Sequence, residues 1–228
     1  MPHLIQIENM SKIYNPGENE VRALDGISLT IDAGEFVAIV GQSGSGKSTL
    51  MNMIGLLDIC TRGKYLLNGV DILFMTDDEL SEVRNKQIGF VFQGFNLIAS
   101  LTAKGNVELP LIYRGIKKEE RSELAINALE RVALENRMTH LPSQMSGGQQ
   151  QRVAIARAVA AKPPIILADE PTGNLDSRSG EDVMRILHEL HKEGRTIILI
   201  THDNDIASEA QRIIRFHDGK IVEDYRND

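Results

Sequence analysis

Short apolar runs alternate with amphipathic segments along this chain. Four of the runs are apolar almost throughout, as are β-strands buried on both faces of a parallel sheet: residues 36–40, 88–92, 165–168 and 196–200. Two other runs, residues 4–8 and 27–31, alternate apolar and polar positions, which is typical of strands with one solvated face. The pattern predicts a β-strand at each of these places.

The amphipathic segments between these runs carry helical signals. Residues 124–132 and 183–190 place their apolar side chains on one helical face, and residues 76–79 form a capping-box pattern that predicts a helix start. Near the end, residues 212–223 read as a β-hairpin with Asp218-Gly219 in its turn. Strands alternating with helices predict an α/β domain with a largely parallel sheet. The stretch from about 94 to 144 lacks buried-strand signals and is predicted to be a mostly helical insertion.

Composition narrows the class of protein without giving its function. The 228 residues can bury a substantial core, and 42% of them are hydrophobic, as in an ordinary globular protein. The net charge of -7, with no Trp, argues against a nucleic-acid partner. A lone cysteine, Cys60, cannot form an internal disulfide, which favours a reducing compartment. No signal peptide and no membrane-spanning run is visible, so we expect a soluble intracellular protein.

A phosphate-binding loop follows the apolar strand at residues 36–40. It has the pattern G-x-x-x-x-G-K-[ST], and the residues after it continue as an apolar helical stretch. Glycines allow backbone N–H groups to converge on a phosphate, and the helix that starts here directs the positive end of its dipole at that anion. We expect the nucleotide to be bound by Gly41, Gln42, Ser43, Gly44, Ser45, Gly46, Lys47, Ser48 and Thr49. Lys47 would reach the β- and γ-phosphates, and Ser48 would bind Mg²⁺.

Two carboxylates end the strand at residues 165–168. Asp169 is placed to support Mg²⁺, and Glu170 can direct a water at the γ-phosphate. A transferase has no need of a water-directed glutamate. The pair therefore favours a nucleoside triphosphatase over a kinase.

Further motifs occur in an order that resembles the nucleotide-binding subunits of ABC transporters. They are Gln93 after the strand at 88–92, the run Ser146-Gly147-Gly148-Gln149, the segment Asn174-Leu175-Asp176, and His202 after the strand at 196–200. The resemblance covers essentially the whole chain and is strongest to the MacB/LolD/FtsE group, through residues 95–98, 106–111 and 167–177. It implies an ABC ATPase fold: a P-loop NTPase core with a RecA-like parallel sheet, an antiparallel β subdomain and the helical insertion, together one ATP-binding domain over residues 1–228.

The resemblance also implies roles for individual residues. Tyr14 would stack on adenine, His202 would contact the γ-phosphate and support Glu170, and Gln93 would touch Mg²⁺ or the attacking water and sense the membrane partner. Glu170, His202, Gln93 and Lys47 would form the catalytic set, and Ser48, Gln93 and Asp169 the Mg²⁺ site. In the family, Ser146, Gly147, Gly148, Gln149 and Asp176 serve the ATP of the opposite subunit in a head-to-tail homodimer.

The partner implied by the resemblance is a pair of separate transmembrane permease subunits, of the MacB, LolC or FtsX kind, which this chain would serve from the cytoplasmic side of the inner membrane. Lipoproteins, peptides and hydrophobic drugs all fit the group as cargo. The group often has Leu-Glu where this chain has Lys104-Gly105, so the resemblance does not identify which permease this chain serves.

Two alternatives to a transport ATPase remain open. An FtsE-like protein would use the same cassette to regulate cell-wall hydrolysis through its membrane partner. A soluble ABC protein acting on DNA or ribosomes is disfavoured, because only 53 positions separate Gln93 from Ser146, too few for a long coiled-coil arm, and because the chain carries one cassette.

Overall fold

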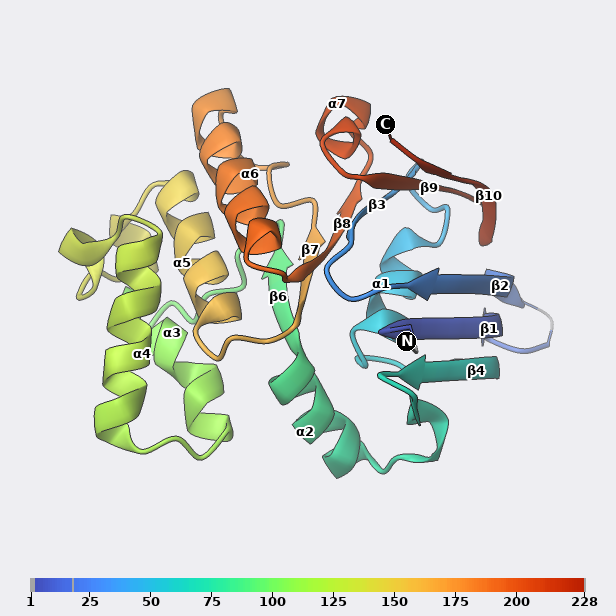
Figure 1. Cartoon of the computed structure of the whole chain (residues 1–228), viewed down its shortest axis with the longest axis horizontal. Helices are drawn as coiled ribbons and strands as arrows, with labels where there is room; N and C mark the ends of the chain where they lie inside the picture. Colours follow the sequence, from blue (N-terminus) through green and yellow to red (C-terminus); the bar gives the residue numbers. More distant parts are fainter. Residues whose placement is uncertain (1–2, 18, 228) are drawn as a thin grey trace. The chain divides into compact units, whose positions relative to one another are not determined.

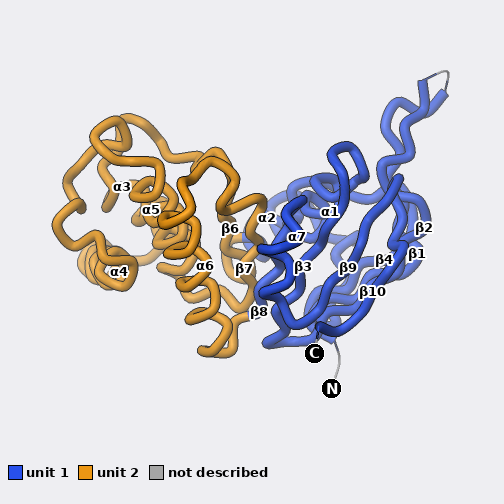
Figure 2. The backbone as a smooth tube through the Cα atoms, turned by 90° about the horizontal axis from the view of Figure 1, so that it is seen from above, with its two compact units in different colours: residues 1–84, 196–228 blue, residues 85–195 orange. Residues whose placement is uncertain are grey.

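The computed structural model describes residues 3–17 and 19–227. It divides into two compact units, one formed by residues 1–84 and 196–228 and the other by residues 85–195 (Figure 2). We call them unit 1 and unit 2 and take each by itself.

The centre of unit 1 is strand β3 (Phe36–Gly41). Parallel strands flank it on both sides, β8 (Thr196–Thr201) and β9 (Arg212–His217), and β10 (Lys220–Arg226) pairs antiparallel with β9 (Figure 1). Every residue from Phe36 to Val40 is at most 2% exposed, so the predicted burial of this strand on both faces is confirmed. The predicted hairpin is also confirmed: Asp218 (φ 45°) and Gly219 (φ 74°) both take the left-handed conformation that a tight two-residue turn requires.

A four-stranded sheet in the order β2-β1-β4-β5 forms the second layer of unit 1. Its strands are β1 (Ile5–Tyr14), β2 (Val21–Ile31), β4 (Arg62–Leu67) and β5 (Val70–Asp71), and all neighbours pair antiparallel. The alternation at residues 4–8 and 27–31 predicted the first two strands. It did not reveal β4, where only Tyr65 and Leu67 point into the core, and where Gly63 lies against the backbone of Asn9 and Met10.

Two helices of unit 1 start where local signals predicted them. Helix α1 (Lys47–Ile54) follows the phosphate loop, and α2 (Asp77–Gln87) begins with the capping box, in which the Glu79 N–H donates to Thr76 Oγ1 (3.4 Å) and the Thr76 N–H donates to Glu79 Oε2 (2.8 Å). A 3₁₀ turn, η1 (Ile72–Phe74), precedes α2, and a short helix, α7 (Asn204–Ser208), follows β8.

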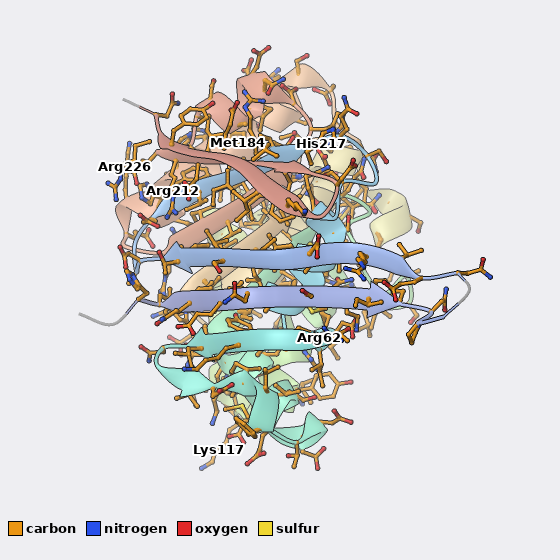
Figure 3. The ribbon with its side chains drawn as sticks, turned by 90° about the vertical axis from the view of Figure 1, so that its right-hand side faces the viewer. Arg62, Lys117, Met184, Arg212, His217 and Arg226 are labelled. Carbon is orange, nitrogen blue, oxygen red and sulfur yellow. The ribbon has the colours of Figure 1, made fainter. Side chains whose placement is uncertain are left out.

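An arginine network joins the C-terminal hairpin to the rest of unit 1. Arg212 donates two hydrogen bonds of 2.7 Å to Asp224, one to Glu35 (3.2 Å) and one to the Thr30 carbonyl (2.9 Å); Arg226 donates to Glu35 as well (Figure 3). The hydrogen bonds that Arg212 donates to Asp224, followed by the charges of Asp224 and Glu35, raise the pKa of Arg212 despite its partial burial. The hairpin is thereby fixed to both layers.

Unit 2 holds a parallel pair of strands, β6 (Ile88–Phe92) and β7 (Ile165–Asp169), with helices α3 (Ala103–Tyr113), α4 (Lys118–Arg131), α5 (Gly147–Val159) and α6 (Ser177–Lys192). Two 3₁₀ turns, η2 (Glu135–Arg137) and η3 (Pro142–Gln144), connect α4 to α5. Residues 94–144 contain helices and turns and no strand. Helix α3 was not located individually, since Pro110 lies inside it. Its start depends on Asn106, which is fully buried and bonds to Ile98, Leu101 and Thr102.

Candidate functional site

The phosphate loop, residues 41–46, connects the end of β3 to the first turn of α1. Three of its glycines are required for different reasons. A Cβ on Gly41 would lie 2.4 Å from the carbonyl oxygen of Phe216, Gly44 has φ +80°, and Gly46 combines φ +104° with a Cβ position 2.4 Å from the Ala23 carbonyl oxygen. No other residue fits these backbone positions without strain or displacement. The sequence match is therefore also a match of geometry.

Lys47 and Ser45 line this loop with buried polar groups. Lys47 is 8% exposed, and its ammonium donates to the carbonyl oxygens of Gly41 (2.7 Å) and Gln42 (2.8 Å). Ser45 Oγ is buried and has no hydrogen-bond partner among the residues described. Gly46, the N-cap residue of α1, has no side chain and forms no side-chain cap hydrogen bond with the first turn of the helix. These donors fit a phosphate, and Gln42, Ser43, Gly44 and Ser48 around them are exposed.

The turn of the C-terminal hairpin supports the loop from within unit 1. The Gly219 N–H donates to the Ser45 carbonyl (2.8 Å), and the Gly219 carbonyl accepts from the Asp25 N–H (3.0 Å). Sequence reasoning found this turn but assigned it no role at the site. The contact joins positions 45 and 219, and no local pattern indicates it.

His202 lies beside the phosphate loop at the same edge of unit 1. It follows β8, whose last residue, Thr201, is paired with Val40 of the neighbouring β3 (Figure 1). The carboxyl ends of these two parallel strands therefore place His202 and the phosphate loop at one edge, as expected for ligand-binding residues of an α/β sheet. The His202 residue is exposed.

Tyr14 is also in unit 1, at the end of β1. Its hydroxyl donates to Asp58 Oδ2 (3.0 Å), and the side chain is half-buried. Burial, and then the hydrogen bond to Asp58, raise the pKa of Tyr14, whereas the Thr49 side chain acts in the opposite direction. Because Thr49 belongs to α1, Tyr14 lies close to the helix that carries Lys47 and Ser48.

In unit 2, the ends of β6 and β7 bring Gln93 and the two carboxylates together. Phe92 pairs with Asp169, so Gln93 and Glu170 follow directly on neighbouring parallel strands. The Gln93 amide donates to Asn174 Oδ1 (3.3 Å), and the Asn174 amide donates to the Gln93 carbonyl (3.1 Å). Glu170 has φ 44°, an unusual conformation for a non-glycine residue and one that is concentrated at functional sites.

Two residues of helix α5, Gln151 and Arg157, form hydrogen bonds with this edge of unit 2, and neither was identified from the sequence. Arg157 donates to the carbonyls of Phe95 (2.9 Å) and Asn96 (2.5 Å), and Gln151 donates to the Pro171 carbonyl (2.6 Å). Gln151 is fully buried on the same helical face as Ile155 and Ala158. The sequence offered one signal for this role of Gln151, namely a polar residue at a position where the helical pattern expects an apolar one. That signal was hard to see because Gln151 is one of three consecutive glutamines.

The run Ser146-Gly147-Gly148-Gln149 begins helix α5. Ser146 caps the helix by accepting from the Gln149 N–H (3.3 Å), and Gln149 accepts from the Ser146 N–H (3.1 Å). A Cβ on Gly148 would lie 2.5 Å from Ser179 Oγ. Asp176 caps α6 by accepting from the N–H (3.0 Å) and the hydroxyl (2.7 Å) of Ser179. Ser179 therefore contacts both this run, at Gly148, and Asp176.

The residues predicted for Mg²⁺ offer the oxygen atoms that this ion prefers: the hydroxyl of Ser48, the amide oxygen of Gln93 and the carboxylate of Asp169. In the described part of the chain, no three His, Cys, Asp or Glu side chains are grouped as a ready metal site. Each of these oxygens is a type of donor that Mg²⁺ takes, and the ion would neutralise charge on the phosphates when bound.

The predicted site residues divide between the two units. Unit 1 brings together Tyr14, the phosphate loop and His202, and unit 2 brings together Gln93, Asp169, Glu170, the run 146–149 and Asp176. In the described residues, no helix is both long and apolar enough to cross a membrane.

A family model and several known proteins are similar to this chain. The family model described as "ABC transporter" matches residues 24–173. An "Uncharacterized ABC transporter ATP-binding protein YvrO" of Bacillus subtilis is 54% identical over 99% of this chain and 98% of its own length. The "Macrolide export ATP-binding/permease protein MacB" of Hyphomonas neptunium is 53% identical over 99% of this chain. The chain spans about a third of that relative, 35% of its length.

Solved structures agree with the sequence relatives. A dimeric post-hydrolysis state of the ATP-binding cassette MJ0796, bound to ADP and Pi, has a TM-score of 0.91 and 46% identity, covering 98% of this chain and 99% of that one. The cbiO1 protein of Clostridium perfringens, part of the ABC transporter complex cbiONQ, has a TM-score of 0.88 and 28% identity, covering 100% and 90%. The predicted fold class is confirmed. This chain belongs to the ABC transporter family, as an ATP-binding cassette related to the MacB-type ATPases.

Proposed function

We propose that this ATPase cassette hydrolyses Mg²⁺-ATP in a head-to-tail homodimer and thereby drives a membrane permease. The observation that carries the proposal is the geometry of the phosphate loop, in which three glycines are individually required and Lys47 and Ser45 present buried polar groups. We further propose that the whole chain works as one ATP-binding domain, with residues 94–144 as its helical subdomain.

We propose the following roles for the predicted site residues. Lys47, Ser48 and the loop amides bind the phosphates, and Tyr14 stacks on adenine. Glu170 directs the attacking water as general base, and His202 contacts the γ-phosphate and supports it. Gln93 and Asp169 complete the Mg²⁺ site with Ser48. Most of the acceleration would come from positioning and from neutralisation of phosphate charge.

The dimer is supported by the arrangement at the start of α5. Ser146, Gly147, Gly148 and Gln149 form a capped helix N-terminus, and such an end binds anions. In the proposed dimer it closes on the γ-phosphate held by the other subunit, with Asp176 communicating between the two sites. The similar MJ0796 cassette is dimeric in two solved structures.

The partner would be two transmembrane permease subunits of the MacB, LolC or FtsX kind, and the cassette would sit at the cytoplasmic face of the inner membrane. The cargo would be a lipoprotein, a peptide or a hydrophobic drug, exported or extracted from the membrane. The relative YvrO, named as an ABC transporter ATP-binding protein, is matched over 98% of its own length. The MacB relative is named for macrolide export, which favours transport over FtsE-like regulation of cell-wall hydrolysis.

Lys47→Ala should abolish nucleotide binding, because it removes the buried ammonium that the phosphate loop holds against its own carbonyls. The measurement is ATP affinity by calorimetry, with Lys117→Ala as the control. Lys117 extends from an exposed position (Figure 3), so its loss should leave affinity unchanged. Undiminished affinity in Lys47→Ala would refute the phosphate site.

Glu170→Gln should still bind ATP and dimerise but lose on the order of 10²–10⁴-fold in hydrolysis, because the amide cannot accept the proton of the attacking water. Single-turnover hydrolysis and light scattering measure the two effects. Glu181→Gln, an exposed substitution on α6, is the matched control. A hydrolysis rate near that of the wild type would remove Glu170 from the mechanism.

Affinity purification of the tagged chain from detergent-solubilised membranes should yield a co-purifying protein with transmembrane helices, identified by mass spectrometry. A permease with an export activity would support transport, and one whose only effect is on cell-wall hydrolases would support the regulatory alternative. Salt-sensitive binding to DNA or ribosomes at physiological ionic strength, without a membrane protein, would contradict both.

A further inference from the structure

The ring of Tyr14 is held by a cluster that the nucleotide motifs do not include. Its hydroxyl donates to Asp58 Oδ2 (3.0 Å), and Lys12, two residues earlier on β1, donates to Asp58 Oδ1 (2.6 Å) and to the Ile59 carbonyl (2.7 Å). The Ile59 N–H donates to the same Asp58 oxygen (2.7 Å). Asp58 therefore accepts three hydrogen bonds, two of them on one oxygen.

Asp58 is itself fixed to the helix that carries the phosphate-binding residues. It follows α1, where the N–H groups of Leu57 (2.8 Å) and Asp58 (3.3 Å) both donate to the Asn52 carbonyl. Burial alone would raise the pKa of Asp58, but the hydrogen bonds from Lys12, Ile59 and Tyr14 bring it below its usual value, so the carboxylate is charged at neutral pH. The side chains of Asp58 and Lys12 are 32% and 13% exposed, which limits the screening of this pair.

The strand that carries Tyr14 does not by itself determine where the ring points. The pairing of β1 with β2 shifts register three times between Ile7 and Ile13, just before Tyr14. Lys12 lies over the ring, with its ammonium 5.0 Å from the ring centroid, and so covers one face. A planar base stacking on this ring would therefore have to use the opposite face.

We propose that Asp58 is a positioning residue for nucleotide binding, whose carboxylate holds the Tyr14 ring, through its hydroxyl and through Lys12, in the orientation that stacks on adenine. The proposal rests on the adenine contact of Tyr14 in the proposed function. It sets the base site at a fixed place relative to α1, and hence relative to Lys47 and Ser48. The base and phosphate halves of the site are then linked through one carboxylate.

The test compares two ligands, Mg²⁺-ATP and Mg²⁺-tripolyphosphate, because the second engages the phosphate loop but has no base. Asp58→Ala should weaken ATP binding by about 5–10-fold and leave tripolyphosphate binding unchanged. The KM for ATP should rise by the same factor with kcat unchanged, since bound ATP still meets an intact catalytic set. Any general effect of the lost charge would alter both affinities alike, so their ratio isolates the contribution of the base.

A double-mutant cycle shows whether Asp58 acts through the ring. In a Tyr14→Ala background there is no ring to hold, so adding Asp58→Ala should cause no further loss of ATP affinity relative to tripolyphosphate. Asp32→Ala, which removes the carboxylate of an exposed ion pair with His3 in the same unit, is the matched control and should change neither affinity. If Asp58→Ala fails to fold, Asp58→Leu serves, because its side chain keeps a similar volume and has no hydrogen-bonding atom for Tyr14 or Lys12.

Three results would overturn the inference. They are equal losses for both ligands, which would make Asp58 a support of α1 alone; unchanged ATP affinity in Asp58→Ala; and a full Asp58→Ala effect in the Tyr14→Ala background. A wild-type chain that binds ATP no more tightly than tripolyphosphate, or a Tyr14→Ala variant with normal ATP affinity, would instead refute the adenine contact of the proposed function, and the inference with it.

Discussion

The rest of the site depends on the turn by which a strand buried on both faces becomes helix α1 within six residues. Gly41 passes against the Phe216 carbonyl, Gly46 against the Ala23 carbonyl, and the Ser45 carbonyl is held by the Gly219 N–H. Two distant segments, strand β2 and the C-terminal hairpin, therefore shape one loop. Its glycines are needed for this close backbone approach, and the amides that result are the ones that bind phosphate.

The parts of the site that the sequence predicted are those with local causes. A glycine-rich turn between an apolar strand and an apolar helix, a carboxylate pair at a strand end, and a Ser-Gly-Gly helix start are each contained in a few consecutive residues. Their structural settings agree with the motifs, down to the capping box between Ser146 and Gln149. The strand pattern succeeded for the same reason, because burial on both faces leaves an unbroken apolar run.

The parts that were missed depend on contacts between distant residues. Asp58 accepts a hydrogen bond from Tyr14, and the Gly219 N–H donates one to the Ser45 carbonyl. In each pair, the sequence around either residue gives no sign of the contact. Arg157 lies on α5 but donates hydrogen bonds to the carbonyls of residues 95 and 96. Both of these residues have the left-handed backbone conformation, which the sequence did not indicate because neither is a glycine. Strand β4 was hidden because only two of its residues point into the core. Tertiary pairing of this kind leaves no trace in local periodicity.

The two glycines of the α5 start differ in a way that allows the dimer to be tested. A side chain at Gly148 would collide with Ser179 of its own chain, whereas a Cβ at Gly147 meets only ordinary contacts of 3.6–3.8 Å. Gly147→Glu should therefore keep the fold while directing a carboxylate at a phosphate held by a second subunit. Lys47→Ala disables the phosphate loop, which in the proposed dimer faces the α5 start of the other subunit.

The most direct measurement is ATP hydrolysis by a mixture of Lys47→Ala and Gly147→Glu chains, each inactive alone. In a head-to-tail dimer of the two, one site joins an intact phosphate loop to an intact α5 start, so an equal mixture should recover up to about a quarter of the wild-type rate. No recovery, in a mixture shown to form mixed dimers, would contradict the head-to-tail dimer and with it the central claim.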